Sequence, residues 1–176
     1  SGLAGTRLAE DASVKTADLI YPLSSNISSE AGTIELWIKP ETPVEDREQH
    51  GFYSIYVFSI HSAETKFSLI WKPGLGLYVF GRAGEGDGNK YKNLPSAFGK
   101  QIEWPENTWH HVAVTWEGRE VALFSDGLLV ARGKTNQSLI FEDENATLSI
   151  APSLSECVVD DIAISARAKS AGQLAA

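Results

Sequence analysis

Few residues in this sequence have the type and spacing that catalysis or metal binding requires. Asp160 and Asp161 are adjacent in the run VVDDIAI, and neighbouring side chains on a strand point to opposite faces. They therefore do not form the facing pair of carboxylates that glycoside hydrolysis uses. A further acidic group, at residues 142–144, falls in a polar stretch between expected strands. With no nucleophile elbow and no Cys/His cluster at metal-ligand spacing, the sequence predicts a non-enzyme without catalytic residues.

The adjacent histidines and the single cysteine favour structural roles. His110 and His111 would lie on opposite faces of one strand, so they are not placed to chelate one ion together. Cys157 follows Glu156 and precedes Val158, a setting typical of a small apolar strand residue rather than a reactive thiol. A lone cysteine also excludes a disulfide within the chain.

Aromatic rings that could stack on sugars are the main binding chemistry that the sequence offers. Trp71 and Tyr78 lie in one expected hairpin, and Trp104 lies in the long irregular stretch Ala83–Asn107. A loop of this length in a compact domain is commonly functional. We therefore predict Trp71, Tyr78 and Trp104 as carbohydrate-binding residues, with ordinary surface or packing roles as the alternative.

The elements that hold these residues are short antiparallel strands. Between Trp109 and Gly133, three apolar runs are separated by Glu117-Gly118 and by Asp126-Gly127. Asp-Gly between apolar runs indicates a tight hairpin, because a type I′ turn needs positive φ at both central positions. The stretch therefore predicts a three-stranded meander, with strands at Val112–Trp116, Val121–Phe124 and Leu128–Ala131.

The segment GTIELWIKP, residues 32–40, has the clearest alternation in the chain. Its three aliphatic residues would share one face of a strand, opposite Thr33, Glu35, Trp37 and Lys39. Further strands are expected near Arg7–Ala9, Val14, Leu19–Tyr21, Phe52–His61, Lys66–Trp71, Gly76–Arg82, Ala146–Ala151 and Glu156–Ser165, with a helical turn at Ser170–Leu174. With no long helix, the chain is predicted to be all-β, and a two-sheet sandwich buries such strands.

Length and composition are those of one globular domain. The 176 residues include 43% hydrophobic side chains and carry a net charge of −8. The acidic balance argues against nucleic acid or an anionic membrane as a partner, because both bind basic patches. No apolar run reaches the length of a membrane span, and the composition of the first residues leads us to expect that they are not a signal peptide. We expect a single domain over residues 1–176, either a mature protein or a part cut from a larger secreted one.

Three segments resemble laminin G-like domains of the concanavalin A-like lectin/glucanase superfamily. GTIELWIKP is similar to their first long strand, and VVDDIAISARAKSAGQL is similar to their closing strand and the turn after it. WHHVAVTWEG and VALFSDGLLVARG are similar to their Trp-His-His-Val-Ala-Val-Thr hairpin and Tyr-Val-Asp-Gly turn, with Phe-Ser in place of Tyr-Val. The residues before Gly32 match poorly. The resemblance implies an all-β, two-sheet antiparallel jelly-roll sandwich with one concave face.

The resemblance also implies a function. The family includes glycan-binding modules, adhesion domains and accessory domains of secreted enzymes. Its glycosidases use a Glu-x-Asp-x-x-Glu strand, which this sequence lacks. We therefore expect a non-catalytic carbohydrate-binding or adhesion module of an extracellular or cell-surface protein. Its partner would be a glycan or an extracellular protein, beside other domains of a parent chain. The alternatives are a structural or assembly domain without a glycan ligand, and a glycoside hydrolase or polysaccharide lyase of this fold.

Two further expectations depend on the resemblance. Asp160 is in phase with the isoleucines of VVDDIAI and is expected on the core side, where a carboxylate needs a cation or several hydrogen bonds. The matching Asp of similar domains helps bind a structural Ca²⁺, which implies Asp160 as a ligand together with Asp11 or Glu10. The alternative is that Asp160 accepts backbone N–H bonds at the rim of the sandwich.

The other tryptophans are interpreted as packing residues. Trp109 and Trp116 match the hairpin of the family. Trp37 also matches a common family tryptophan, and we expect it to pack beneath a loop, although it shares a strand face with Glu35 and Lys39.

Overall fold

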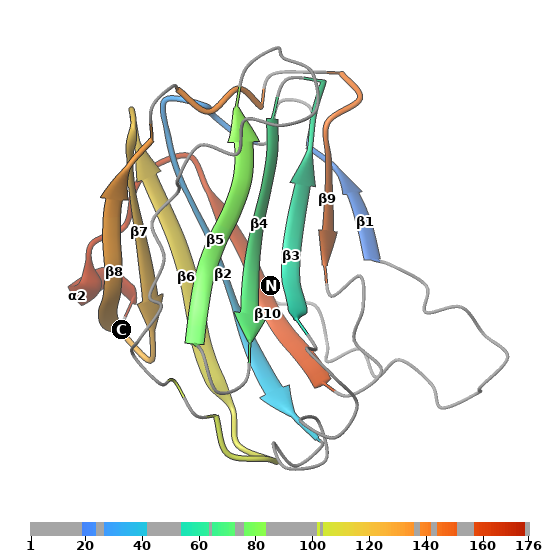
Figure 1. Cartoon of the computed structure of the whole chain (residues 1–176), viewed down its shortest axis with the longest axis vertical. Helices are drawn as coiled ribbons and strands as arrows, with labels where there is room; N and C mark the ends of the chain where they lie inside the picture. Colours follow the sequence, from blue (N-terminus) through green and yellow to red (C-terminus); the bar gives the residue numbers. More distant parts are fainter. Residues whose placement is uncertain are drawn as a thin grey trace, which may run out of the picture.

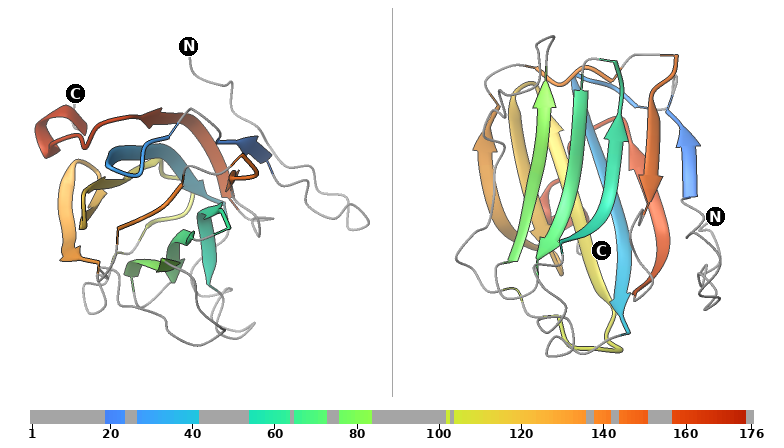
Figure 2. Two further views of the ribbon diagram at one scale, coloured as in Figure 1. Left: turned by 90° about the horizontal axis from the view of Figure 1, so that it is seen from above. Right: turned by 45° about the vertical axis from the view of Figure 1, so that its right-hand side comes forward.

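A computed structural model describes residues 19–23, 27–41, 54–63, 65–72, 76–83, 102, 104–135, 138–141, 144–150 and 157–174. Within them, ten strands form two antiparallel sheets of five strands that face each other (Figures 1 and 2). We call the first the β3 sheet, with the order β1 (Leu19–Pro22), β9 (Thr147–Ile150), β3 (Ile55–His61), β4 (Thr65–Lys72), β5 (Gly76–Ala83). The second is the β2 sheet, with the order β10 (Cys157–Ser165), β2 (Ala31–Pro40), β6 (His110–Glu117), β7 (Glu120–Ser125), β8 (Leu128–Lys134).

Strand β2 is an interior strand of the second sheet and lies between the edge strand β10 and the central strand β6 (Figure 1). Its alternation is confirmed, because Ile34, Leu36 and Ile38 are fully buried in the core between the sheets. Trp37 points to the other side and is 40% exposed. The residues at positions 33, 35, 37 and 39 therefore form part of what we call the outer face of the β2 sheet.

The predicted meander is strands β6, β7 and β8. Asp126 and Gly127 connect β7 to β8 with φ of 51° and 73°, which are the two positive values that a type I′ turn requires. The Asp126 carboxylate also accepts the backbone N–H of His111 at 2.9 Å. The turn residue is thereby bonded to β6, the first strand of the same meander.

The core is centred on aromatic side chains from both sheets. The Trp116 ring lies 5.4 Å from Phe141 and 6.2 Å from Phe67, both in edge-to-face arrangements. Its Nε1 donates to the Ser28 carbonyl at 2.9 Å, so the buried indole N–H has a partner. Gly32 pairs with Trp116 across β2 and β6 and leaves room for the ring, because a Cβ there would lie 2.1 Å from Cζ2.

The closing strand β10 contains a β-bulge that changes which residues face the core. Val159 pairs with core residue Ile38, so Asp160, which pairs with Trp37, faces outward. The register shifts after Asp160, and Ile164 then pairs with core residue Ile34. The expectation that Asp160 shares the core side with the isoleucines is therefore wrong, because one extra residue in a bulge reverses the alternation.

The remaining expectations divide between described and undescribed residues. Cys157 is buried in the core, as predicted. The helical turn is α2 (Ala171–Leu174). The strands expected near Arg7–Ala9 and Val14 lie outside the described residues. No helix in the described ranges is long and apolar enough to cross a membrane.

Candidate functional site

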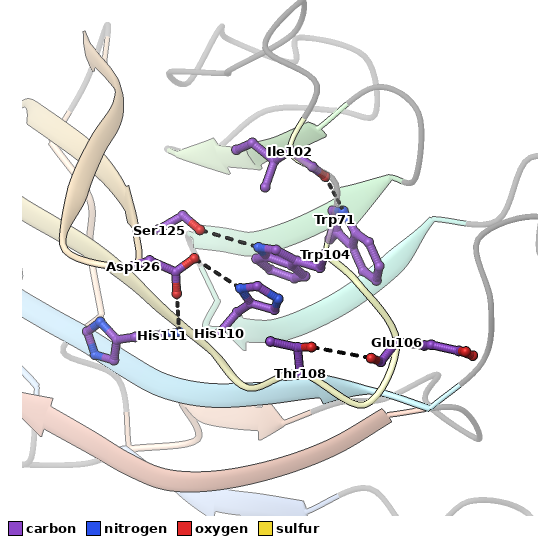
Figure 3. Close-up of polar contacts among 9 residues, drawn as sticks. All are labelled: Trp71, Ile102, Trp104, Glu106, Thr108, His110, His111, Ser125 and Asp126. Atoms are coloured by element: carbon purple, nitrogen blue, oxygen red, sulfur yellow. Dashed lines mark hydrogen bonds and ion pairs between the residues drawn. The ribbon is translucent and has the colours of Figure 1, made fainter.

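Two of the three predicted sugar-binding aromatics lie in the core. Trp71 and Trp104 are 0% and 1% exposed, and their ring centroids are 4.6 Å apart. Trp71 Nε1 donates to the Ile102 carbonyl, and Trp104 Nε1 donates to Ser125 Oγ, both at 3.3 Å (Figure 3). The prediction that these rings stack on a ligand is wrong, because a sugar needs an open ring face and both faces are covered.

Trp104 instead packs against the first strand of the meander. The His110 ring stacks on it, with centroids 5.4 Å apart and an angle of 13°, and His110 Nδ1 lies 3.0 Å from Asp126 Oδ2. Figure 3 shows the rings of His110 and His111 on opposite sides of β6, as predicted for neighbouring residues of a strand. Tyr78 is half-buried, with its hydroxyl 3.4 Å from Ser54 Oγ, and its role stays a prediction.

A different set of residues comes together on the outer face of the β2 sheet. They surround a shallow hollow of about 210 Å³, which we call the outer hollow. Its polar and aromatic lining is Glu35, Trp37, His111, Asp161, Lys169 and Gln173.

Each of these side chains is positioned by a separate feature of the fold. Glu35 and Trp37 alternate outward from β2, and His111, which pairs with Trp37, projects from the neighbouring strand β6. Asp161 lies in the bulge of β10 and has a φ of 47°, a left-handed conformation that Asp tolerates better than most residues. Bulges frequently redirect side chains next to functional sites.

The segment after β10 supplies the rest of the lining. It is fixed across the sheet at Thr33, whose Oγ1 donates to the Arg167 carbonyl at 2.8 Å and accepts the Lys169 N–H at 2.9 Å. Further on, Leu174 forms an apolar cluster with three residues of β6 and β7, Ala113, Ala122 and Phe124. We call residues 166–174 the C-terminal strap.

The strap brings a cation to a buried carboxylate. Lys169 Nζ forms an ion pair with Glu35, and the Nε2 atom of His111 lies 3.4 Å from the other carboxylate oxygen. The Glu35 side chain is only 11% exposed, and a carboxylate so poorly hydrated requires charged or hydrogen-bonding partners. Within the described part of the chain, the buried Nδ1 of His111 has no hydrogen-bond partner.

The exposed tryptophans lie at and beside this hollow. Trp37 is 40% exposed and its ring lies 5.3 Å from that of His111. Trp109 is 38% exposed, with Lys39 Nζ 5.4 Å from its ring centroid. The sequence analysis predicts that both tryptophans pack against the protein, but both are only partly buried. The signal for Trp37 was the polar character of its strand face, shared with Glu35 and Lys39.

The calcium prediction remains a prediction. Asp160 Oδ1 accepts the N–H of Asp161 at 2.8 Å, as the rim alternative expects. Among the described residues, no group of three His, Cys, Asp or Glu side chains is placed to hold a metal ion. The expected partner Asp11 lies outside those residues, so the pairing of Asp160 with Asp11 at a calcium ion stays a prediction.

Several solved structures share the two-sheet sandwich fold of this chain. The binding domain of botulinum neurotoxin serotype D aligns with a TM-score of 0.62 at 15% identity, covering 89% of this chain and 38% of that one. Domain 4 of AbnA, a GH43 extracellular arabinanase from Geobacillus stearothermophilus solved with arabinotriose, gives 0.58 at 16%, covering 83% and 65%. A SAP-like pentraxin from Limulus polyphemus gives 0.53 at 16%, covering 83% and 68%.

These likenesses show the fold of the chain. The chain spans less than two fifths of the neurotoxin chain. No curated protein matches the chain in sequence. A family profile does match, over residues 9–175, and includes the segments in which the resemblance was found. The chain therefore belongs to the concanavalin A-like lectin/glucanases superfamily.

Proposed function

We propose that this chain is a non-catalytic carbohydrate-binding module that binds glycans on the outer face of the β2 sheet. The observation that carries the proposal is Trp37, a residue that is 40% exposed and forms part of the outer hollow. Sugars combine apolar C–H faces with hydroxyl groups, so a flat ring beside charged and amide groups suits them. Trp109 extends the open aromatic surface beyond the hollow.

Similar structures support recognition of glycans or receptors by this fold. The arabinanase domain was solved with an arabinotriose, and the botulinum structures are receptor-binding domains. Because the arabinanase is extracellular, we also propose an extracellular or cell-surface location for this chain.

The outer hollow supports binding better than hydrolysis. Glycosidases need two carboxylates free to act on either side of the scissile bond. Glu35 is held by Lys169 and is nearly covered, which leaves Asp161 as the exposed carboxylate of the lining. A reducing-sugar assay over a panel of polysaccharides tests this point, and sustained product release would overturn it.

Titration calorimetry after a glycan-array screen tests the binding site. We expect Trp37→Ala to weaken the best ligand at least about tenfold, because the apolar contact with the ring is lost. Tyr78→Ala is the matched control, since Tyr78 is a half-buried aromatic residue of the other sheet. Loss of binding in Tyr78→Ala but not in Trp37→Ala would move the site to the β3 sheet and refute our placement.

An assembly domain is the second candidate, and one observation favours it. Strand β8 is an edge of the β2 sheet and carries Leu128 and Leu129, which are 72% and 44% exposed. Exposed apolar residues on an edge strand favour pairing with another chain. Light scattering of the purified chain tests this role: a stable dimer that Leu128→Asp dissociates, together with no glycan binding, would replace our first proposal.

A further inference from the structure

The charges of the outer hollow narrow the class of sugar that it would accept. We infer that the hollow binds one sugar ring that carries no acidic group, and that Asp161 is the residue that excludes uronic acids. This inference rests on the proposed function and extends it to the chemical class of the ligand.

The size of the hollow limits what enters it. Sites for drug-sized ligands have volumes of roughly 300–1,000 Å³, whereas this hollow measures about 210 Å³. Trp37 forms part of its wall, and the strap residues Lys169 and Gln173 form another part. A single ring stacked on Trp37 fits such a space, with the rest of the glycan on the open surface.

The cation of the hollow is already engaged. Lys169 Nζ is bound to Glu35, and its side chain is only 25% exposed. A sugar carboxylate could bind this ammonium group only by competing with Glu35, whose own charge would then be left without its cation. Leaving a buried carboxylate uncompensated is costly. Lys169 therefore stays paired with Glu35 and is not available to an acidic ligand.

The free charge of the hollow is negative. Asp161 is exposed, and none of the described residues offers its carboxylate a hydrogen bond or an ion pair. Asp160 is not part of the lining, but it places a second carboxylate beside the hollow, because it pairs with Trp37 across β10 and β2. An acidic ring stacked on Trp37 would thus approach two like charges, while a neutral ring could donate its hydroxyl groups to them.

Matched pairs of oligosaccharides test this inference directly. Each pair has one configuration (gluco, galacto or manno) and differs only at C6, which is a hydroxymethyl group in one member and a carboxylate in the other. Calorimetry on the full chain is expected to show the neutral member of the bound pair binding about tenfold tighter, a ratio that falls as salt is raised.

Asp161→Asn is the decisive variant. Asn accepts a positive φ as readily as Asp does, so the bulge is preserved while one charge is removed. We expect the preference for the neutral sugar to shrink several-fold in Asp161→Asn. It should not change in Glu144→Gln, which makes the same change of net charge at an exposed turn away from the hollow. A circular dichroism melt confirms that both variants fold.

The possible results separate this inference from the proposed function. If the wild-type chain binds no member of any pair and no glycan on the array, the proposed function fails. If it binds both members of a pair equally, or prefers the uronate, the charge inference is refuted while glycan binding stands. An unchanged preference in Asp161→Asn would also refute the role of Asp161.

Discussion

Replacing Lys169 with methionine tests whether the strap is held by the charge pair with Glu35. Methionine keeps the apolar length of the side chain and removes only the ammonium group. The backbone N–H of Lys169, which donates to Thr33 Oγ1, is unaffected. Any loss of stability therefore reports on the ion pair rather than on the backbone hydrogen bond that also holds the strap.

The magnitude follows from the burial of the two partners. Breaking a fully buried pair costs roughly 3–5 kcal/mol, because a charge is left without compensation. The Lys169 and Glu35 side chains are 25% and 11% exposed, and His111 stays 3.4 Å from the carboxylate. Water and His111 thus offset part of the loss, and we expect about 2 kcal/mol for Lys169→Met. For a chain of this size that is a fall in Tm of about 4–8 °C.

The reverse variant has a smaller expected cost. Glu35→Gln leaves the more exposed partner, Lys169, which can turn its ammonium group toward water. We expect about 1 kcal/mol for it, and the double variant should lose clearly less than the sum of the two singles. Urea unfolding of the four proteins measures this cycle. A larger loss for Glu35→Gln than for Lys169→Met, or strict additivity, would refute this account of the buried carboxylate.

Two further predictions concern the core and the pH dependence of stability. Gly32→Ala should lower the free energy of unfolding by at least about 2 kcal/mol, since its Cβ would lie 2.1 Å from the buried Trp116 ring. Gly172→Ala is the control, because a Cβ there has nothing within 4 Å and should cause no loss. Equal effects of the two variants in urea unfolding would contradict the packing of Gly32 against Trp116. The pKa of His61 lies below its ordinary value because partial burial and then the Lys66 charge disfavour the protonated ring. In the unfolded chain the pKa of His61 is near 6.5. The contribution of His61 to folding stability is therefore fully present above about pH 6.5, and it is lost as pH falls toward the lowered pKa of the folded state. The difference in Tm between pH 5 and pH 8 should therefore be smaller in His61→Gln than in the wild-type chain. An unchanged difference in Tm would contradict this role of His61.

The parts of the fold that depend on local signals are predictable from the sequence. The alternation of residues 32–40 places Ile34, Leu36 and Ile38 correctly, since a strand has only two faces and one must be buried. The turn at Asp126 and Gly127 is equally local, because few residue pairs tolerate two positive φ values. Both signals lie within a few residues, and neither needs knowledge of a distant partner.

The bulge in β10 shows why alternation alone misplaced a site residue. Ile162 and Ile164 face the core side as expected, but before the bulge Cys157 and Val159 face the core instead of Asp160, because one extra residue separates the two parts of the strand. Nothing in VVDDIAI distinguishes a regular strand from a bulged one, because aspartate is compatible with both. The positive φ of Asp161 becomes evident only in the structure. The same feature that defeats the pattern places Asp161 in the outer hollow.

The sugar-binding prediction for Trp71 and Trp104 is wrong for a related physical reason. A tryptophan binds ligands or packs according to what covers it, and the cover comes from segments distant in sequence. Trp104 is 21 residues from Ser125, to which its N–H donates, and the sequence gives no sign of that contact. Conversely, the strap contacts Thr33 and Glu35 but leaves the Trp37 ring 40% exposed. Exposure of a ring on this sheet thus depends on which positions the strap covers.

The strap therefore links the stability of the outer face to its chemistry. Without residues 166–174, the outer face of β2 would expose Glu35 to water and would lack both Lys169 and Gln173. Docking of the strap pairs the charge of Glu35 with Lys169 and encloses one side of the hollow, while the bulge supplies Asp161 on the other side. The ion-paired carboxylate of Glu35 and the unpaired carboxylate of Asp161 then both line the outer hollow, beside the exposed Trp37. It is this division between the two acidic residues, rather than their number, that would allow the hollow to accept a neutral sugar and reject an acidic one.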